Sequence, residues 1–124
     1  MNQKLKELIS IPLDEASQKD DESLIEELKK AELIMPIEII SNDPPEFKPL
    51  KLEDENKNIF VALFSDEDEL VKINVEFSVI NISTENLAKI ISDDFNGVAI
   101  NPFSEFHLKI PLNEFKNLFE KDKN

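Results

Sequence analysis

The chain has 124 residues, enough for one domain in which folding hides about two-thirds of the surface of the open chain. Nine Phe but no Trp or Tyr mean that the core is built mainly from Leu, Ile, Val and Phe. With 27 acidic residues against 14 basic ones, all of them Lys, the net charge is -13, which disfavours nucleic acid and anionic membrane surfaces because both would be repelled.

The first residues have helical spacing of apolar side chains. Leu5, Leu8 and Ile9 lie at i, i+3 and i+4 and predict a short amphipathic helix over residues 3–10, ended near Pro12. This segment lacks the apolar core of a signal peptide, and no run of the sequence is long enough for a membrane span, so we expect a cytoplasmic protein.

Residues 13–22 are mostly charged and predict a solvated linker or the start of a second helix. Ser23 and Glu26 have the spacing of a capping box, which predicts a helix that begins there and runs to about Lys30. Its apolar stripe consists of Leu24, Ile25, Leu28 and Ala31.

Residues 33–40 are apolar and β-branched and predict a strand, in which Pro36 indicates an edge position or the start of the strand. Residues 41–49 contain three prolines and several turn-forming residues, and predict a loop. A short strand is predicted over 50–53.

After a turn at 54–57, the continuous apolar run 58–64 predicts a strand that is covered on both faces. The following region has two conflicting patterns. Acidic residues directly after Ser65 are typical of a helix start, whereas the alternation further on is typical of a strand. We predict a short helix over 66–72 and a strand over about 75–82.

The run Asp66-Glu67-Asp68-Glu69 also resembles a cation site. A calcium loop of the EF-hand type needs ligands at alternate positions and a glycine at the sixth, where this chain has Val71. Capping of a helix by carboxylates explains the cluster without a metal, so no metal site is predicted.

Ser83 or Thr84 caps a further predicted helix, whose buried stripe is Leu87, Ile90 and Ile91. Asp93 and Asp94 end it before a turn at Asn96 and Gly97, the chain's one glycine, which is expected to use a positive φ there.

Residues 98–101 and 106–110 predict a pair of strands separated by a turn that begins at Asn101 and Pro102. Pro111 suits the first position of a closing amphipathic helix, whose apolar residues are Leu112, Phe115, Leu118 and Phe119. The sum is a single α+β domain, with a mixed or antiparallel sheet of about five strands and helices packed on it.

Residues that carry chemistry are scarce. Without cysteine there are no disulfides, thiolate nucleophiles or Cys-ligated zinc. His107 is expected to face solvent, and no serine has the glycine context of a nucleophile elbow. We therefore predict no catalytic, cofactor-binding or metal-binding residues. An enzyme that uses carboxylates such as Asp93 and Asp94 in a pocket remains an alternative, because spatial clusters need not be visible in a sequence.

Three segments, in this order and spacing, resemble the N-terminal domain of the SseB family, the enhanced serine sensitivity protein B group; they are residues 28–36, 59–70 and 97–103. The resemblance extends over about residues 22–119, preceded by a short helix and acidic linker (1–21) and followed by a charged tail (120–124). Val71 and Lys72 depart from the pattern, where the family often has an aromatic residue. The second domain of the longer members is not expected in this chain.

The resemblance implies the α+β fold and a helix directly after Ser65, but no mechanism, because the family has no established catalytic residues. It favours a non-enzymatic protein that acts through contacts with an unidentified protein partner. The candidate interaction surface is formed by the matched residues at strand ends: Phe64, Ser65, Glu69, Asn101, Pro102 and Phe103. The charge of -13 leaves a second hypothesis open, an acidic immunity protein, inhibitor or secretion chaperone that binds a basic partner.

Overall fold

The computed structural model describes residues 3–11, 18–73 and 78–120. The helices in these ranges are α1 (Gln3–Ile9), α2 (Gln18–Lys30), α3 (Glu67–Leu70), the 3₁₀ turn η1 (Val71–Ile73), α4 (Thr84–Ile90) and α5 (Leu112–Glu120). The strands are β1 (Glu32–Asn42), β2 (Pro45–Pro49), β3 (Lys51–Glu53), β4 (Ile59–Leu63), β5 (Ser78–Ser83), β6 (Gly97–Ile100) and β7 (Leu108–Pro111). The predicted α+β class is confirmed, although the strands form two sheets rather than one of about five strands.

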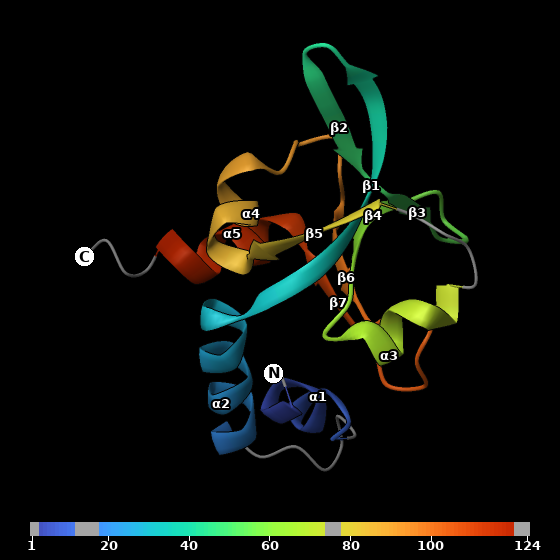
Figure 1. Cartoon of the computed structure of the whole chain (residues 1–124). Coiled ribbons are helices and arrows are strands. Elements are labelled where there is room, and N and C mark those ends of the chain that lie inside the picture. The colour runs from blue at the N-terminus through green and yellow to red at the C-terminus, as the bar shows by residue number, and fades with distance from the viewer. Residues whose placement is uncertain (1–2, 12–17, 74–77, 121–124) are drawn as a thin grey trace.

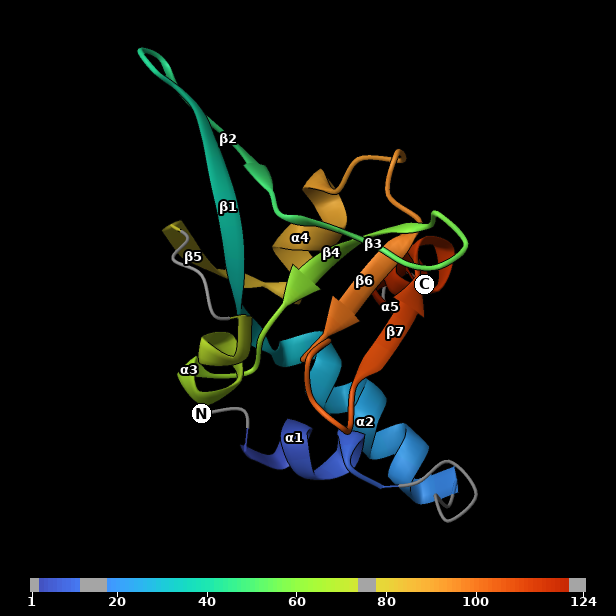
Figure 2. The same cartoon turned by 90° about the vertical axis from the view of Figure 1, so that its right-hand side faces the viewer.

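One sheet has three antiparallel strands in the order β2-β1-β5, and the other has four in the order β3-β4-β6-β7. Only the β4–β6 pair in the described sheets is parallel. The long strand β1 connects the two sheets, because Ile34 and Phe64 exchange two backbone hydrogen bonds of 2.9 Å at the end of β4. Figures 1 and 2 show α4 and α5 on one side of the four-stranded sheet and α3 on the other.

The core lies between the sheets and the helices α1, α2, α4 and α5. Its buried residues alternate along β1, β4 and β6, which is the periodicity expected when one face of a strand packs against helices. They include Leu33, Met35 and Ile37 of β1, Val61 and Leu63 of β4, Val98 and Ile100 of β6, Leu5 of α1, Leu87 of α4 and Phe115 of α5. The other face of β4 is buried too, as the continuous apolar run 58–64 predicted.

The prediction that Pro36 marks an edge or a strand start is wrong, because it lies in the middle of the central strand β1. Ile34 directs its N–H and C=O toward β4. Pro36 lies two residues further on and therefore directs its backbone to the same side, where its carbonyl accepts from the N–H of Leu50 at 3.0 Å. The missing N–H therefore falls on the side away from β5. The β1–β5 ladder is not interrupted.

The predicted loop at 41–49 is also wrong, because it is the second half of a hairpin. Residues 45–49 pair with β1 in antiparallel register, with a bulge between Ile39 and Ser41, and the Asp43–Pro44 peptide bond at the turn is cis. Prolines at both ends of β2 suit an edge strand, since a proline can pair on one side only. The hairpin projects beyond the body of the domain as an arm (Figure 2).

Gly97 does not use a positive φ, in contrast to the prediction, and it begins β6 rather than forming a turn. A Cβ atom at this position would lie 2.1 Å from the carbonyl oxygen of Ile110, in the neighbouring strand β7. The glycine is therefore required by the close approach of two strands. The left-handed residue is Asn101, whose φ is 54°.

Three predicted helices exist with different ends. Ser23 lies inside α2, which begins at Gln18, so the predicted capping box is wrong; Asp21 and Glu22 near the positive end of the helix dipole favour the earlier start. Ser83 caps α4 by accepting from the N–H of Asn86, as predicted. The prediction that Pro111 is the first residue of the closing helix is wrong, because Pro111 is the last residue of β7 and α5 begins at Leu112.

Ile90 is 63% exposed, although it was predicted to share a buried stripe with Leu87 and Ile91. The helix ends at Ile90, and the extended Ile91 is the residue that enters the core beside Leu87. The helix-to-strand transition after Ser65 is present as α3, η1 and β5. The expected helix end at Pro12, the linker residues 13–17, the first part of the 75–82 strand and the tail residues 121–124 lie outside the described residues.

Candidate functional site

Asn101 and Ser65, two residues of the predicted interaction surface, are joined at the ends of the parallel strands β4 and β6. The side-chain oxygen of Asn101 accepts from the Ser65 N–H at 2.9 Å, and its amide nitrogen donates to the Ser65 hydroxyl at 3.0 Å. Both residues are buried. Asn101 also donates its backbone N–H to the carbonyl of Leu63 at 2.8 Å. These groups hold the two strand ends together from inside the domain.

Asn96 holds the opposite ends of the same two strands. Its side-chain oxygen accepts from the N–H of Ile59 at 2.8 Å, its own N–H donates to the Ile59 carbonyl at 2.7 Å, and its carbonyl accepts from Leu112 at 2.9 Å. Asn101 belongs to residues 97–103, one of the three segments that resemble the SseB family, and Asn96 directly precedes that segment. Its polar residues are largely used in structural hydrogen bonds.

Glu69 lies apart from that pair, in an ion-pair cluster that attaches α1 to α3. Its buried carboxylate is 3.3 Å from the ammonium of Lys6 and 3.0 Å from that of Lys72. Lys6 also reaches Asp66 at 3.0 Å, and its hydrogen bond with Asp66 is the main reason why its pKa is raised. Asp66 caps α3 by accepting from the N–H of Glu69, which confirms a helix directly after Ser65.

Phe64, Pro102 and Phe103 complete the predicted surface. Phe64 is fully buried, and the ring of Phe103 stacks on it at a centroid distance of 6.3 Å. Phe103 is nevertheless 48% exposed and Pro102 is half-buried. The structure therefore brings Phe64, Ser65, Asn101 and Phe103 together, but leaves a solvent-accessible apolar surface at Pro102 and Phe103. Whether a partner binds there stays a prediction.

The residues considered for catalysis do not converge. His107 is exposed, and its Nδ1 is 3.4 Å from the carbonyl oxygen of Ser104. The side chain of Asp93 is 89% exposed and receives a hydrogen bond from Lys116 at 2.8 Å, which lowers the pKa of Asp93. Asp94 lines a different surface, described next. Among residues 3–11, 18–73 and 78–120, no three His, Cys, Asp or Glu side chains are grouped as metal ligands would be.

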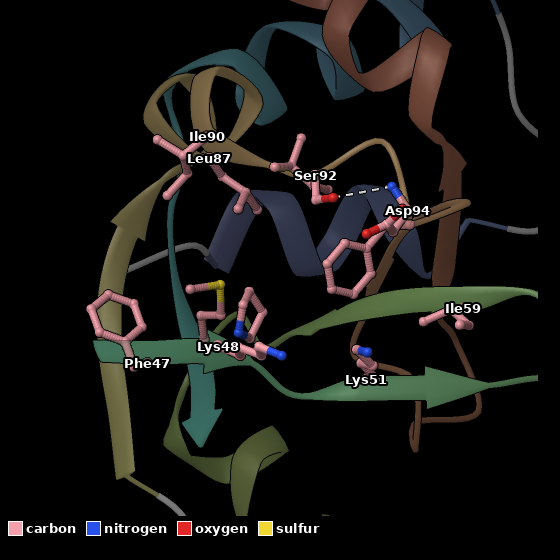
Figure 3. Close-up of a pocket in the computed structure, with 12 residues that line it drawn as sticks. Phe47, Lys48, Lys51, Ile59, Leu87, Ile90, Ser92 and Asp94 are labelled. Atoms are coloured by element: carbon pink, nitrogen blue, oxygen red, sulfur yellow. Dashed lines mark hydrogen bonds between the residues drawn. The ribbon is translucent and has the colours of Figure 1, made fainter. Parts of the chain in front are cut away.

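An apolar groove of about 400 Å³ lies between the arm and α4 (Figure 3). We call it the hairpin–α4 groove and define it by its lining residues: Met35, Phe47, Lys48, Pro49, Lys51, Ile59, Leu87, Ile90, Ile91, Ser92, Asp94 and Phe95. They come from β1, β2, β3, β4, α4 and the turn after α4. The volume lies within the range of about 300–1,000 Å³ that is common for ligand sites.

The apolar walls of this groove differ in exposure. Met35 and Leu87 belong to the core and form its deep part. Phe47 on β2 and Ile90 on α4 stand on opposite walls and are 47% and 63% exposed. Large apolar side chains that face each other across an open groove are typical of binding surfaces.

The polar groups of the groove are few. Lys48 and Lys51 belong to β2 and β3, whereas Ser92 and Asp94 belong to the turn after α4. The N–H of Asp94 donates to the Ser92 hydroxyl at 3.1 Å, which fixes the turn (Figure 3). Lys48 pairs with Glu38 on the arm face away from Phe47, and Glu53 pairs with Ile59 of the groove lining, so the charges around this surface are mixed.

Sequence reasoning missed this groove for two reasons. The arm was predicted as a loop, so Phe47 had no defined position, and Ile90 was predicted to be buried. The sequence did contain one signal. Phe47 lies among prolines and polar residues, where an apolar side chain has no core to enter. That signal indicates an exposed aromatic residue, but it does not reveal which element lies opposite.

A second depression, of about 460 Å³, lies between α2, β7 and α5. Its deep apolar residues Leu28 and Ile110 belong to the core, and its rim carries Lys29, Lys109 and Glu114. Ile25 is the large apolar side chain of this lining that is exposed. The surface lacks the two facing apolar walls of the hairpin–α4 groove, so it is the weaker candidate.

The fold and the groove define a small α+β domain, in which strand β1 connects the two sheets and an apolar groove lies beside a projecting hairpin. The chain belongs to the family of the SseB protein N-terminal domain, whose profile matches residues 9–116. No curated protein and no solved structure matched the chain. None of the helices in the described part of the chain is long and apolar enough to cross a membrane.

Proposed function

We propose that this SseB-family domain is a protein-binding module without catalytic activity, and that it holds a segment of a partner protein in the hairpin–α4 groove. The observation that carries the proposal is the pair of exposed apolar side chains, Phe47 and Ile90, on facing walls of a groove whose floor is Met35 and Leu87. Burial of such side chains on binding gives the largest contributions to protein–protein affinity.

The shape of the apolar surface favours a protein segment over a small molecule. Ile39 pairs with Phe47 across the arm, so both side chains lie on the same face of the sheet, and Ile39 is 57% exposed. The apolar surface thus continues from the groove along the arm, beyond the lining residues. A small molecule would fill only the groove, whereas a chain segment can cover both parts.

The apolar character of the lining supports binding rather than bond chemistry. Its titratable side chains are Lys48, Lys51 and Asp94, and all three are exposed at the rim rather than enclosed with a nucleophile. General acid–base catalysis depends on groups that are held in hydrogen-bond reach of a reacting atom. The rim groups are better suited to fixing the orientation of a bound segment.

The experiment is affinity capture with the tagged full chain from a lysate of the source cells, comparing groove variants with a matched control. Phe47→Ser and Ile90→Ser each remove one apolar wall. Ile40→Ser is the control, because Ile40 lies on the same arm and is 52% exposed but does not line the groove. We expect a protein that the wild type and Ile40→Ser retain, and that the groove variants lose by about ten-fold or more.

All three side chains are about half exposed or more, so each substitution should change the free energy of unfolding by less than about 1 kcal/mol, which urea denaturation checks. A partner that all variants retain equally would exclude the groove as its binding surface. If Phe103→Ser alone removed that partner, the binding surface would be the strand ends near Pro102 and Phe103 instead. Turnover of a substrate by the purified chain would contradict the non-enzymatic part of the proposal.

A further inference from the structure

We propose that α1 covers, within its own chain, a docking site for a basic amphipathic helix of a partner protein, and that the partner binds by replacing α1. The site is the surface of α2, α3 and the adjoining core that α1 contacts, which we call the α1 site. Neither α2 nor α3 lines the hairpin–α4 groove, so this inference does not rest on the proposed function.

The contacts of α1 show what the α1 site accepts. Helix α1 lies beside α2 and close to α3 (Figures 1 and 2). Leu5 is 1% exposed and belongs to the core cluster, against which Ile9, one turn later, also packs. The ammonium of Lys6 is 3.0 Å from Asp66 and 3.3 Å from Glu69, at the start of α3. The α1 site therefore has an apolar part and an acidic part next to each other.

The charge of α1 is opposite to that of the surface that it covers. Residues 1–11 contain two Lys and one Glu, whereas residues 66–69 are all acidic and the chain has a net charge of -13. Lys72 pairs with Glu69 at 3.0 Å and would remain if α1 left, but the four carboxylates would then be in excess. Such a surface attracts a basic helix and repels an acidic one.

Helix α1 is suited to opening without unfolding of the rest of the domain. It has seven residues, which is too short for a helix that is stable by itself in water. No strand of the described sheets pairs with it, and residues 10–17 join it to α2. The family profile begins at residue 9, so α2 and α3 belong to the matched domain and most of α1 precedes it. Terminal segments of this kind open at a lower free energy than core strands.

The sequence of α1 defines the partner. Leu5, Leu8 and Ile9 form one apolar face, and Lys6 follows the most buried of these residues. We expect the partner helix to have the same apolar spacing, with Lys or Arg directly after the residue that enters the core. This is recognition of a helix in a groove, with α1 as the competitor in the same chain.

The test measures, by fluorescence anisotropy, the affinity of the full chain for a labelled peptide of residues 1–11. In the wild type α1 competes with the peptide, at an effective concentration that a short linker places at about millimolar. Leu5→Ser and Lys6→Glu each weaken the docking of α1, so they should increase the affinity for the peptide by about ten-fold and about five-fold. The peptide should also restore the free energy of unfolding of Leu5→Ser toward the wild-type value, measured by urea denaturation.

The chemistry of the occupant is tested by changing the peptide. A peptide with Leu5→Ser should not bind measurably, and one with Lys6→Glu should bind the Leu5→Ser chain at least about five-fold more weakly than the native peptide. Equal binding of the native and Lys6→Glu peptides would overturn the basic character of the partner.

Lys4→Glu is the matched control, because it makes the same change of charge on an exposed residue of the same helix. It should leave the affinity for the peptide within about two-fold of the wild-type value. Phe47→Ser should also leave it unchanged, which separates the α1 site from the hairpin–α4 groove.

Amide hydrogen exchange of the wild type gives a measurement that needs no variant. The N–H of Ser10 donates to the carbonyl of Lys6 at 3.1 Å and closes the end of α1. It should exchange at least about a hundred-fold faster than the amides of β4 and β6, and an excess of peptide should increase its rate further.

Three outcomes would overturn the proposal. Equal affinity of the peptide for the wild type and both α1 variants would show that α1 and the peptide do not share a site. Absence of binding to every chain, or a Ser10 amide as protected as those of β4, would show that α1 is a fixed part of the core. A wild-type dimer that the peptide converts to monomers, seen by analytical ultracentrifugation, would show that the occupant is α1 of a second copy and not a partner helix.

Discussion

Asn96 and Asn101 each hold one end of the parallel pair β4–β6, and both roles depend on bonds to a strand about 37 residues away in the chain. The sequence predicts turns at both asparagines. The turn at Asn101 is present, with the left-handed backbone that asparagine tolerates, whereas Asn96 directly precedes β6 and forms no turn with Gly97. Their partners could not be predicted, because the spacing of a turn residue carries no information about which distant strand end it meets.

Gly97 is the residue for which prediction and structure differ most sharply. A need for a positive φ and a close approach of two strands predict different losses of stability when this glycine is replaced. If the glycine were needed only for a positive φ, Gly97→Ala would cost about 1–2 kcal/mol. Because its Cβ would lie 2.1 Å from the backbone oxygen of Ile110, we expect a loss of at least about 3 kcal/mol in the free energy of unfolding, measured by urea denaturation.

The control for this variant is Asp94→Ala, three residues earlier, where the side chain is exposed and a change within about 0.5 kcal/mol is expected. Gly97→Ser should be at least as destabilising as Gly97→Ala, since it adds a larger group at the same clash. A loss near 1 kcal/mol for Gly97→Ala would show that β6 and β7 can separate at this point, and that the close approach does not explain the glycine.

At the scale of elements, hydrophobic periodicity predicted most helices and the buried strands β4 and β6. Each of these segments buries apolar side chains on one face or on both faces, and this burial produces the pattern in the sequence. It failed for the arm. The prolines of residues 41–49 are turn formers by local preference, but they tolerate the edge of a sheet once β1 supplies the pairing. Tertiary pairing therefore overrides the local preference here.

Helix α1 gives a prediction at this scale, because its attachment depends on one buried side chain. Leu5 is almost completely buried in the core cluster, while Leu8 on the same helix is half-buried. Leu5→Ala should lower the free energy of unfolding by about 3 kcal/mol, and Leu8→Ala by about 1 kcal/mol, since both changes alter helix propensity equally and differ in the cavity created. Urea denaturation of the two variants measures the difference.

Equal effects of the two substitutions would indicate that α1 does not dock through Leu5. A double-mutant cycle of Lys6→Met and Asp66→Asn provides a second measurement of the same attachment, because these side chains are 3.0 Å apart and partly exposed. We expect a coupling below about 1 kcal/mol, so that the apolar contact, and not the ion pair, supplies most of the attachment.

At the scale of the whole molecule, the order of the predicted elements indicated the α+β class and composition indicated a core mainly of Leu, Ile, Val and Phe, whereas the groove could not be predicted. Its lining comes from six separate segments. Of the residues on its two exposed walls, Ile90 was predicted to be buried, and Phe47 was predicted to lie in a loop without a defined position. A surface of this kind is defined by how the arm and α4 are placed relative to each other. That placement is set by β1, which connects the two sheets and has no counterpart in a local pattern.

The net charge of -13 predicts an unusual pH dependence, in which two effects oppose each other. As the pH falls from 7 toward the isoelectric point near 4.4, repulsion between carboxylates decreases and the folded state gains stability. At lower pH, carboxylates with native-state partners must be protonated, which favours unfolding. We therefore expect the free energy of unfolding to be highest at about pH 5, between the two regimes.

Asp54, Asp66 and Asp93 set the acid limb, because the pKa of each is lowered in the folded state. For Asp54 the main cause of the lowered pKa is the hydrogen bond from the Asn58 backbone. For Asp66 burial raises the pKa, but the hydrogen bonds from Lys6 and from the Glu69 N–H outweigh it. For Asp93 the main cause is the hydrogen bond from Lys116. A group with a depressed folded pKa contributes stability above its unfolded value of about 3.9, and loses it as the pH falls through the folded value. Stability should therefore decline below about pH 4.

Urea denaturation at pH 8, 7, 6, 5, 4 and 3 measures this profile, and a second series at higher salt separates its two causes. About 0.5 M NaCl screens repulsion between exposed carboxylates, so it should raise the free energy of unfolding at pH 7 and change it little at pH 5. Asp66→Asn should flatten the acid limb without changing the salt effect at pH 7. A profile that rises steadily from pH 5 to pH 8 would contradict the assignment of -13 as a destabilising charge, because the paired carboxylates are already ionised in this range and cannot cause the rise.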